Sequence, residues 1–431
     1  MEEALHSLGG QIMCNSTRET IMYQSSHFES QTPMALSLMA DTVLNPRFDE
    51  EEIDSAREAA RYEVKQLASK PEMFLPEVMH ALAYNNQGLG NSLVCPPERL
   101  DSITSPLIRQ TMQDWYRPER MVVAGAGMSH QELVELTDKH FSSLKASPPS
   151  PLPTQVRPQQ SIPSHVLSPS LPTSPKSSLT RAASYLFPQK QKDAPSPLSL
   201  TSGYTGGTKF IFDGDAEFNH LYVGFESVGI HDDDVYTVAT MQILLGGGGS
   251  FSAGGPGKGM YSRLYTHILN HYPQIDHCAS YHHIYADSAL FGLFASFVPA
   301  SSGYRGGNTP SHILPHLVHQ LSLLLYSAVQ AQELQRAKNQ LKSSLMMALE
   351  SRVIQVEDLG RQILVHGRRV PIEQMLEKID AVTPDDIKRV ANRLYGPQSG
   401  NKPTVLTLGH ENITDHEAIF RKYGLAGGES A

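Results

Sequence analysis

The sequence predicts an α+β protein made of two similar domains joined by a disordered linker. Two short motifs recur in the same order in the first and last parts of the chain. A segment rich in Pro and Ser separates the two copies, and each copy contains strand-like and helix-like stretches. A chain of 431 residues is long enough for two or three domains with their own cores.

The repeated motifs indicate a duplicated domain. The segment 52–57, Glu-Ile-x-x-Ala-Arg, recurs 281 residues later at 333–338 as Glu-Leu-x-x-Ala-Lys. The segment 108–118, which ends in Trp-Tyr-x-Pro, recurs 279 residues later at 387–397, which ends in Leu-Tyr-x-Pro. Two matches in order with a nearly constant offset are typical of duplication.

Residues 146–203 form the predicted linker. Pro and Ser dominate this segment and no apolar period runs through it, so it cannot bury enough surface to offset the ordering of its backbone. The sequence therefore predicts an N-terminal domain at 1–145 and a C-terminal domain at 204–431.

Alternating apolar residues predict strands in both halves. In the first half we expect a strand pair within 9–28 that turns near Ser16 to Arg18, and a strand beginning at Met121, "MVVAGAG". In the second half, the expected strands are 218–227, a pair within 275–298 that turns near Ala286 and Asp287, and 404–409.

Long charged helices are expected at about 49–67 and 331–350, and each half closes with a helix that ends at Tyr-x-Pro. The closing helix of the second half has a clear start. Thr383 is placed to be its N-cap, Pro384 its first residue and Asp386 the partner of a capping box.

The net charge of −9 and the isoelectric point near 6.1 are unlike those of a general nucleic-acid binder, which needs a basic surface. They suit a cationic partner. The three cysteines are far apart and include no C-x-x-C pair, which disfavours a disulfide framework or a thiolate metal site. No apolar run is long enough to span a bilayer.

A glycine-rich run is the most unusual feature of the sequence. Eight of the fourteen residues from Gly246 to Gly259 are glycine, and apolar periodic segments lead into and out of the run. We therefore expect a loop between two helices. It is not a phosphate-binding loop, because Gly257-Lys258 is followed by Gly259 and not by Ser or Thr.

The sequence predicts no catalytic or metal-binding residue in this chain. Neither His-Glu-x-x-His nor His-x-x-Glu-His occurs. His267 and His271 are four residues apart but lack the general-base Glu, and His282 and His283 lie side by side in a strand, so they face opposite ways. Acidic residues gather instead around the helix that begins near 331: Glu333, Glu350, Glu357 and Asp358. Such a cluster is either a solvated face or a surface for cationic peptides.

Three stretches, 246–265, 280–292 and 345–364, resemble the pitrilysin-like family of zinc metallopeptidases. Within that family they are similar to the non-catalytic alpha-type subunits of heterodimeric mitochondrial processing peptidases. The resemblance covers nearly everything except the linker and the extreme C-terminus. It implies two domains, each a mostly antiparallel sheet with helices packed on one side.

The resemblance also implies a function. A beta subunit would hold zinc through His-x-x-Glu-His and a further Glu, and would cleave Arg-rich presequences of precursors imported into the mitochondrial matrix. This chain would bind no cofactor itself and would recruit the presequence. The implied substrate-binding residues are Gly246, Gly247, Gly248, Gly249, Ser250, Phe251, Gly254, Gly255, Gly257, Lys258, Gly259, Glu333, Glu357 and Asp358. Glu63 stands where the family has its distal zinc Glu.

Two alternatives stay open at this stage. One is a structural core subunit of the respiratory bc1 complex, and the other is a zinc peptidase whose motif lies upstream of Met1. The resemblance places a transit peptide, a first strand and a first helix upstream of Met1, so we expect the sequence to be truncated at its N-terminus.

Overall fold

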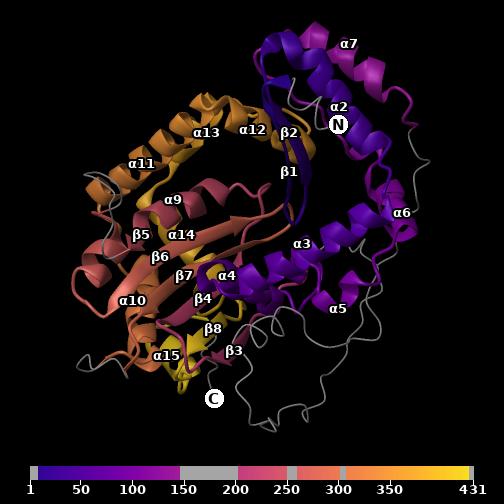
Figure 1. Cartoon of the computed structure of the whole chain (residues 1–431). Coiled ribbons are helices and arrows are strands. Elements are labelled where there is room, and N and C mark those ends of the chain that lie inside the picture. The colour runs from indigo at the N-terminus through magenta and orange to yellow at the C-terminus, as the bar shows by residue number, and fades with distance from the viewer. Residues whose placement is uncertain (1–7, 146–201, 250–259, 301–306, 427–431) are drawn as a thin grey trace.

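The computed structural model describes residues 8–145, 202–249, 260–300 and 307–426 (Figure 1). The C-terminal half is built on one six-stranded sheet in the order β3-β8-β4-β7-β6-β5. β3 and β8 are parallel and every other neighbouring pair is antiparallel. The strands are β3(Gly207–Phe212), β4(Asn219–Ser227), β5(Gly247–Gly249), β6(Ile275–Ile284), β7(Ala289–Phe297) and β8(Thr404–Gly409).

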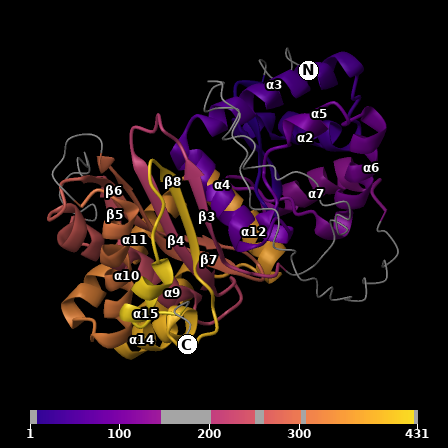
Figure 2. The same ribbon diagram turned by 90° about the horizontal axis from the view of Figure 1, so that it is seen from below.

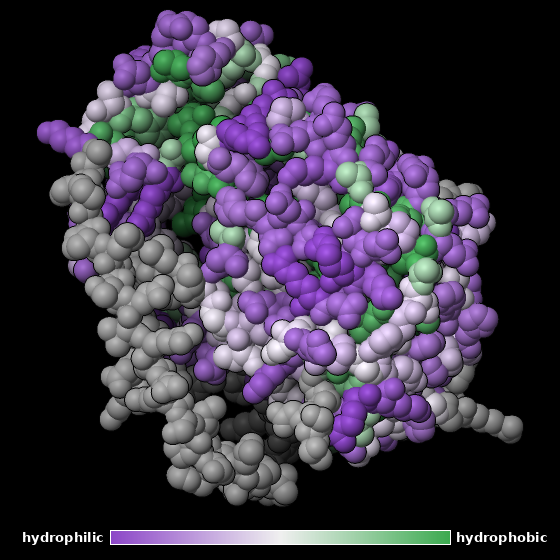
Figure 3. Space-filling view, turned by 180° about the vertical axis from the view of Figure 1, so that it is seen from behind, coloured by the Kyte–Doolittle hydropathy of each residue, from purple (hydrophilic) through white to green (hydrophobic). Residues whose placement is uncertain are grey.

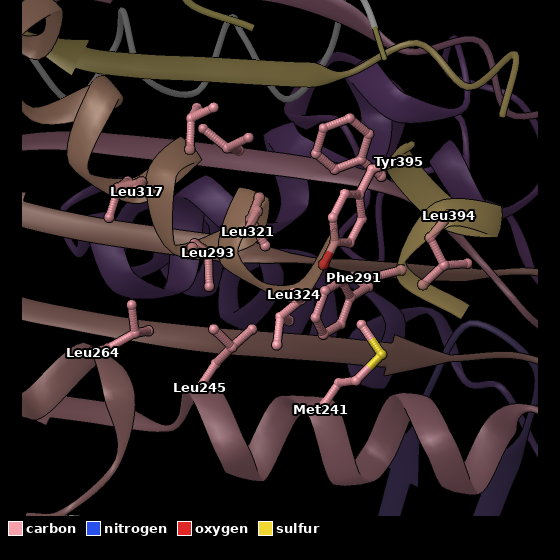
Figure 4. Packing of buried hydrophobic residues seen from close by; sticks show 14 of the residues in the cluster. Met241, Leu245, Leu264, Phe291, Leu293, Leu317, Leu321, Leu324, Leu394 and Tyr395 are labelled. Atoms are coloured by element: carbon pink, nitrogen blue, oxygen red, sulfur yellow. The ribbon is translucent and has the colours of Figure 1, made fainter. Parts of the chain in front are cut away.

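One face of this sheet is covered by helices and holds the main hydrophobic core. The helical elements of this half are α9(Val235–Leu245), the π-helix η4(Tyr265–Leu269), α10(Pro310–Tyr326), α11(Ala331–Glu350), α12(Arg352–His366), α13(Ile372–Ala381), α14(Pro384–Tyr395) and α15(His416–Lys422). Figure 4 shows Met241 and Leu245 of α9, Phe291 and Leu293 of β7, and Leu321 of α10 converging between the layers.

The opposite face of the sheet is covered by a helix from the N-terminal half. α4(Pro71–Ala83) lies beside β3 and β8 (Figure 2). Phe74, Leu75 and Val78 of α4 pack in a second core with Leu406 and Leu408 of β8. Burial of these side chains removes apolar surface from water and therefore holds the two halves together.

The N-terminal half is otherwise helical around a two-stranded antiparallel ribbon. Its elements are β1(Gln11–Ser16), β2(Ile21–Ser26), η1(Glu29–Gln31), α2(Thr32–Leu44), α3(Glu50–Ala68), α4, η2(Gly88–Gly90), α5(Pro97–Leu100), α6(Ser105–Trp115), η3(Pro118–Arg120) and α7(His130–Phe141). Apolar residues gather on its surface at the upper left of Figure 3, and its exposed side chains include Met13, Phe28, Leu107 and Trp115.

Most of the predicted elements are confirmed. The predicted antiparallel sheet of the second half, its strand pair β6–β7 and the long helix α11 are present. The capping box of α14 is formed: the Thr383 hydroxyl accepts from the Asp386 amide, and the Asp386 carboxylate accepts from the Thr383 amide. No helix among the described residues is long and apolar enough to cross a membrane.

One predicted element is absent, and a second differs in part from the prediction. The segment 121–126 is no strand, because no described strand lies alongside to supply the hydrogen-bonded ladder that a strand needs. The glycine run does lie between two helices, α9 and the π-helix η4, but it is not wholly a loop. Its first residues form the edge strand β5, and the segment that follows contains the π-helix η4.

The repeated motifs fall on matching helices but in different surroundings. The first motif lies on α3 and α11, and the second lies on α6 and α14. α14 buries Ile387, Val390 and Leu394 against the sheet, whereas within α6, all of which the structure describes, no side chain is buried. The difference follows from the six-stranded sheet of the second half, because the described part of the first half has only the two-stranded ribbon.

Candidate functional site

The glycine run begins where α9 ends, and its first two glycines are required by the backbone. Gly246 has φ +59° and Gly247 has φ +106°, which L side chains rarely adopt. A Cβ atom on Gly246 would lie 2.4 Å from the Ser262 Cβ, and one on Gly247 would lie 2.1 Å from the Cys278 carbonyl oxygen. These two glycines therefore allow β5 to approach β6 closely.

Hydrogen bonds hold the start of the glycine run in place. The Gly247 amide donates to the Ser262 Oγ at 3.0 Å, and the Gly246 carbonyl accepts from the Ser280 amide at 2.9 Å. Ser262, which follows the run, is buried. The start of the run is therefore held both to β6 and to Ser262.

Part of the predicted site lies outside the described residues. These positions are Ser250, Phe251, Gly254, Gly255, Gly257, Lys258 and Gly259, and their assignment to substrate binding stays a prediction. Of the predicted glycines, Gly246, Gly247, Gly248 and Gly249 are described, and the last three are the residues of β5.

A groove of about 940 Å³ opens between the start of the glycine run and α11. Gly246, Gly247 and Tyr261 line one side, and α11 forms the other. The polar uncharged residues that α11 contributes are Gln332, Gln335, Asn339, Gln340, Ser343 and Ser344. This volume lies within the range of sites that bind ligands of moderate size.

These α11 residues were not singled out in the sequence, although a signal is there. They recur at spacings of three and four, which places them along one side of a helix. Their amides and hydroxyls carry no net charge, so they lack the charge pattern that distinguishes Glu333, Glu357 and Asp358 in the sequence. The neutral face is therefore recognisable only once the helix is known to border a groove.

Glu333, a predicted substrate-binding residue, is engaged by another side chain. Its carboxylate accepts two hydrogen bonds from Arg263, from Nε at 2.7 Å and from Nη2 at 2.9 Å. The Arg263 side chain is only 8% exposed and that of Glu333 only 17%. The pair therefore joins the first turn of α11 to the segment that follows the glycine run.

Glu357 and Asp358 lie on α12 and are not brought together with Glu333. The rise along α11 separates Glu333 from the end of that helix by roughly 25 Å, and α12 begins only after it. Figure 1 shows α12 beside β2, where the Gln24 side-chain amide donates to the Val353 carbonyl at 2.7 Å. The predicted acidic residues therefore belong to two separate places.

The two carboxylates on α12 have different surroundings. Glu357 forms an ion pair with Arg361 one turn later. Asp358 accepts a hydrogen bond of 2.7 Å from the Gln362 side chain. Partial burial raises the pKa of Asp358 above its usual value, although Arg361 and the hydrogen bond from Gln362 oppose this shift.

The described residues do not fit a zinc site. No group of three or more His, Cys, Asp or Glu side chains among them is placed to hold a metal ion. Glu63 is exposed on α3. His267 contacts the Gln320 side-chain oxygen at 3.0 Å, and His282 and His283 face opposite sides of the sheet, against Phe291 and His80 respectively.

Comparisons with known proteins agree with this architecture. A family model described as "Insulinase (Peptidase family M16)" matches residues 1–97, and one described as "Peptidase M16 inactive domain" matches 102–341. A chain of complex III2 from Candida albicans has a similar structure, with a TM-score of 0.72 and 14% sequence identity over 96% of this chain and 86% of that chain. That likeness shows the fold.

Several proteins of similar sequence are named as alpha subunits of the mitochondrial processing peptidase. The mitochondrial-processing peptidase subunit alpha of Neurospora crassa is 41% identical over 93% of this chain and 73% of that protein. A probable subunit of the same name from Schizosaccharomyces pombe is 37% identical over 99% of this chain and 77% of that protein. The human subunit is 32% identical over 95% and 70%. The chain therefore belongs to peptidase family M16 and, within it, to the alpha-subunit branch.

Proposed function

We propose that this chain is the non-catalytic, substrate-recognition subunit of a heterodimeric mitochondrial processing peptidase. It binds the basic presequences of imported precursors in the matrix, and a beta subunit that holds zinc cleaves them. The observation that carries the proposal is the identity of 32–41% with alpha subunits over more than nine-tenths of the chain.

The division of labour between the subunits is supported by the residues of this chain. A zinc peptidase of the His-x-x-Glu-His type uses two histidines and a downstream glutamate as ligands, with the glutamate of the motif as general base. The sequence contains no His-x-x-Glu-His motif, and the described residues provide no group that fits a metal ion. The zinc and the activated water therefore belong to the partner in this proposal.

The charge of the chain supports a basic ligand. The formal net charge is −9, and Glu357 and Asp358 are partly exposed on α12. Presequences are Arg-rich amphipathic segments. A negative surface attracts such a ligand over several ångströms and raises its rate of capture, most strongly at low ionic strength.

No observation favours a role as a core subunit of the respiratory bc1 complex over the role of a processing-peptidase subunit. The likeness to a complex III chain rests on 14% identity and shows the fold alone. The alpha subunits, by contrast, share 32–41% identity with this chain. We therefore favour the processing-peptidase role.

The test is cleavage of a fluorogenic Arg-rich presequence peptide by the catalytic beta partner, alone and with this chain. We expect cleavage only when both chains are present, and we expect deletion of residues 246–259 to remove it. Cleavage by this chain alone would overturn the non-catalytic assignment. Full activity of the beta partner alone would overturn the recruiting role.

A further inference from the structure

The groove between β5 and α11 is almost free of charge. Arg336 is the one charged residue among the described residues that line it. Glu333 lies near the start of α11, but its carboxylate is already neutralised by Arg263. An Arg side chain of a presequence therefore finds no free carboxylate among the described lining residues, and the groove suits an uncharged segment.

The α11 wall presents amide groups in a usable arrangement. The Gln335 Nε2 donates to the Asn339 Oδ1 at 3.0 Å, which ties the two side chains together one turn apart. This bond leaves the Gln335 carbonyl oxygen and the Asn339 amino group for another molecule. One acceptor and one donor held side by side match the N–H and C=O groups of a peptide backbone.

The other wall is the edge of a sheet. β5 is the last strand in the sheet order, and no described strand lies on its outer side. The Gly246 carbonyl is bound to β6, and the Gly247 amide already donates to the Ser262 Oγ, so this wall offers close approach of a backbone and not a free Gly247 amide. Glycine has no side chain to shield this edge, so an extended chain can approach its backbone closely.

Two apolar side chains flank this polar surface. Tyr261 is 68% exposed on the side of the glycine run, and Met347 is 60% exposed on α11. A flexible thioether and an aromatic ring are suited to apolar side chains of differing shape. The groove thus combines a fixed polar wall with adaptable apolar contacts.

From these observations we infer that the groove binds the backbone of an extended, uncharged peptide segment between α11 and the edge of β5. Gln335 and Asn339 position that segment by hydrogen bonds to its backbone. The groove therefore discriminates only weakly among the side chains of the peptide. The inference rests on the proposed function, because the peptide is taken to be part of a presequence. Recognition of basic residues is then assigned to other surfaces of the protein.

The inference is tested by binding of labelled peptides to the full chain, measured by fluorescence anisotropy. One probe is an Arg-rich presequence peptide. A second has N-methyl groups on its backbone amides within the uncharged segment, and a third has the same number of N-methyl groups within its Arg-containing segment. The variant is Gln335→Ala with Asn339→Ala, and its control is Gln110→Ala with Gln113→Ala on the exposed side of α6.

We expect N-methylation of the uncharged segment to weaken binding to the unsubstituted chain about tenfold, because two or three hydrogen bonds are lost. The α11 variant should bind the unmodified peptide about tenfold more weakly, with an unchanged dependence on salt, and should be less affected by the methyl groups. The control variant and the third peptide should retain most of the affinity.

The possible failures are distinguishable. If the unsubstituted chain does not bind the unmodified peptide, the proposed function fails and the inference fails with it. If that peptide binds, but neither the methyl groups in the uncharged segment nor the α11 variant weakens binding, the inference is overturned and the proposed function stands. Circular dichroism and thermal unfolding of both variants exclude misfolding as the cause of any loss.

Discussion

The Glu333 carboxylate accepts two hydrogen bonds from the Arg263 guanidinium, and both side chains are largely buried. Arg263 follows the glycine run by a few residues, whereas Glu333 lies in the first turn of α11. The pair therefore fixes the geometry of the groove at one end. The contribution of this ion pair can therefore be measured as a change in the free energy of unfolding.

Replacement of Glu333 by Gln should lower the free energy of unfolding by about 2–4 kcal/mol, because Arg263 keeps its charge and loses its partner in a poorly hydrated place. Urea unfolding measures this change. The double substitution Glu333→Gln with Arg263→Met should recover most of the loss. A stability equal to that of the unsubstituted chain would contradict the structural role.

Replacement of Gly247 by Ala should cost more than about 2 kcal/mol, because its positive φ is strained for Ala and the new Cβ would meet the Cys278 carbonyl at 2.1 Å. Gly249 is the matched control. A Cβ there would have its nearest neighbour at 3.8 Å, so Gly249→Ala should change stability by less than about 1 kcal/mol. Equal effects in thermal unfolding would show that close approach to β6 is not what requires glycine.

Removal of the charges on α12 by Glu357→Gln with Asp358→Asn should raise the KM for an Arg-rich presequence about fivefold at low salt, because each exposed charge pair contributes up to about 1 kcal/mol. The effect should shrink at high salt. A KM that does not depend on salt in both proteins would count against electrostatic capture.

The single substitution Asp358→Asn tests whether the Asp358 charge stabilises the fold, separately from any role in binding the presequence. Burial raises the pKa of Asp358 in the folded chain, so its ionisation opposes folding as the pH rises through the interval between the unfolded and folded pKa values. At neutral pH the Asn variant should therefore be at least as stable as the unsubstituted chain. A clear loss in urea unfolding would show that the hydrogen bond from Gln362 outweighs the effect of burial.

Acid should loosen the contact between the two halves. His80 of α4 lies 5.1 Å from His283 of β6, and burial lowers their pKa values to about 3 and about 4. Arg18 lies close enough to lower both values further, Glu77 binds Arg18, and the Tyr285 hydroxyl lies 2.7 Å from the His80 Nε2.

The unfolded chain takes up protons near pH 6.5, whereas the folded chain does so only near pH 3–4. Stability should therefore fall as the pH drops below about 6.5, by on the order of 2 kcal/mol per histidine at pH 5. Urea unfolding at pH 7.5 and pH 5 measures the fall, and His80→Asn should remove part of it. An identical pH dependence in the variant would exclude His80 as its source.

The elements that could be predicted from sequence are those fixed by local chemistry. Thr383, Pro384 and Asp386 form a helix start whatever surrounds them, and the alternating residues of β6 and β7 identify a strand pair. The segment 121–126 has the composition of a strand but no neighbouring strand in the described chain. A strand requires a second segment to pair with, so the composition of 121–126 alone predicted a strand that does not form.

The site was less predictable than the fold for a similar reason. The position of the glycine run is evident in the sequence. That Gly247, Gly248 and Gly249 form a strand could not be predicted, because it depends on the pairing with β6. The pairing of Glu333 with Arg263 could not be predicted, because the two residues are seventy positions apart in sequence. The amide face of α11 has meaning only beside the groove, which the sequence does not reveal.

The packing of α4 on the outer face of the sheet determines whether the two halves stay together after a protease cuts the chain between them. Phe74, Leu75 and Val78 are held by Leu406 and Leu408, and none of these contacts depends on the peptide bonds between residues 146 and 201. A chain nicked in that interval should still elute as one particle, with its two fragments separating only in denaturant. The covalent connection between the two halves is then dispensable once folding is complete.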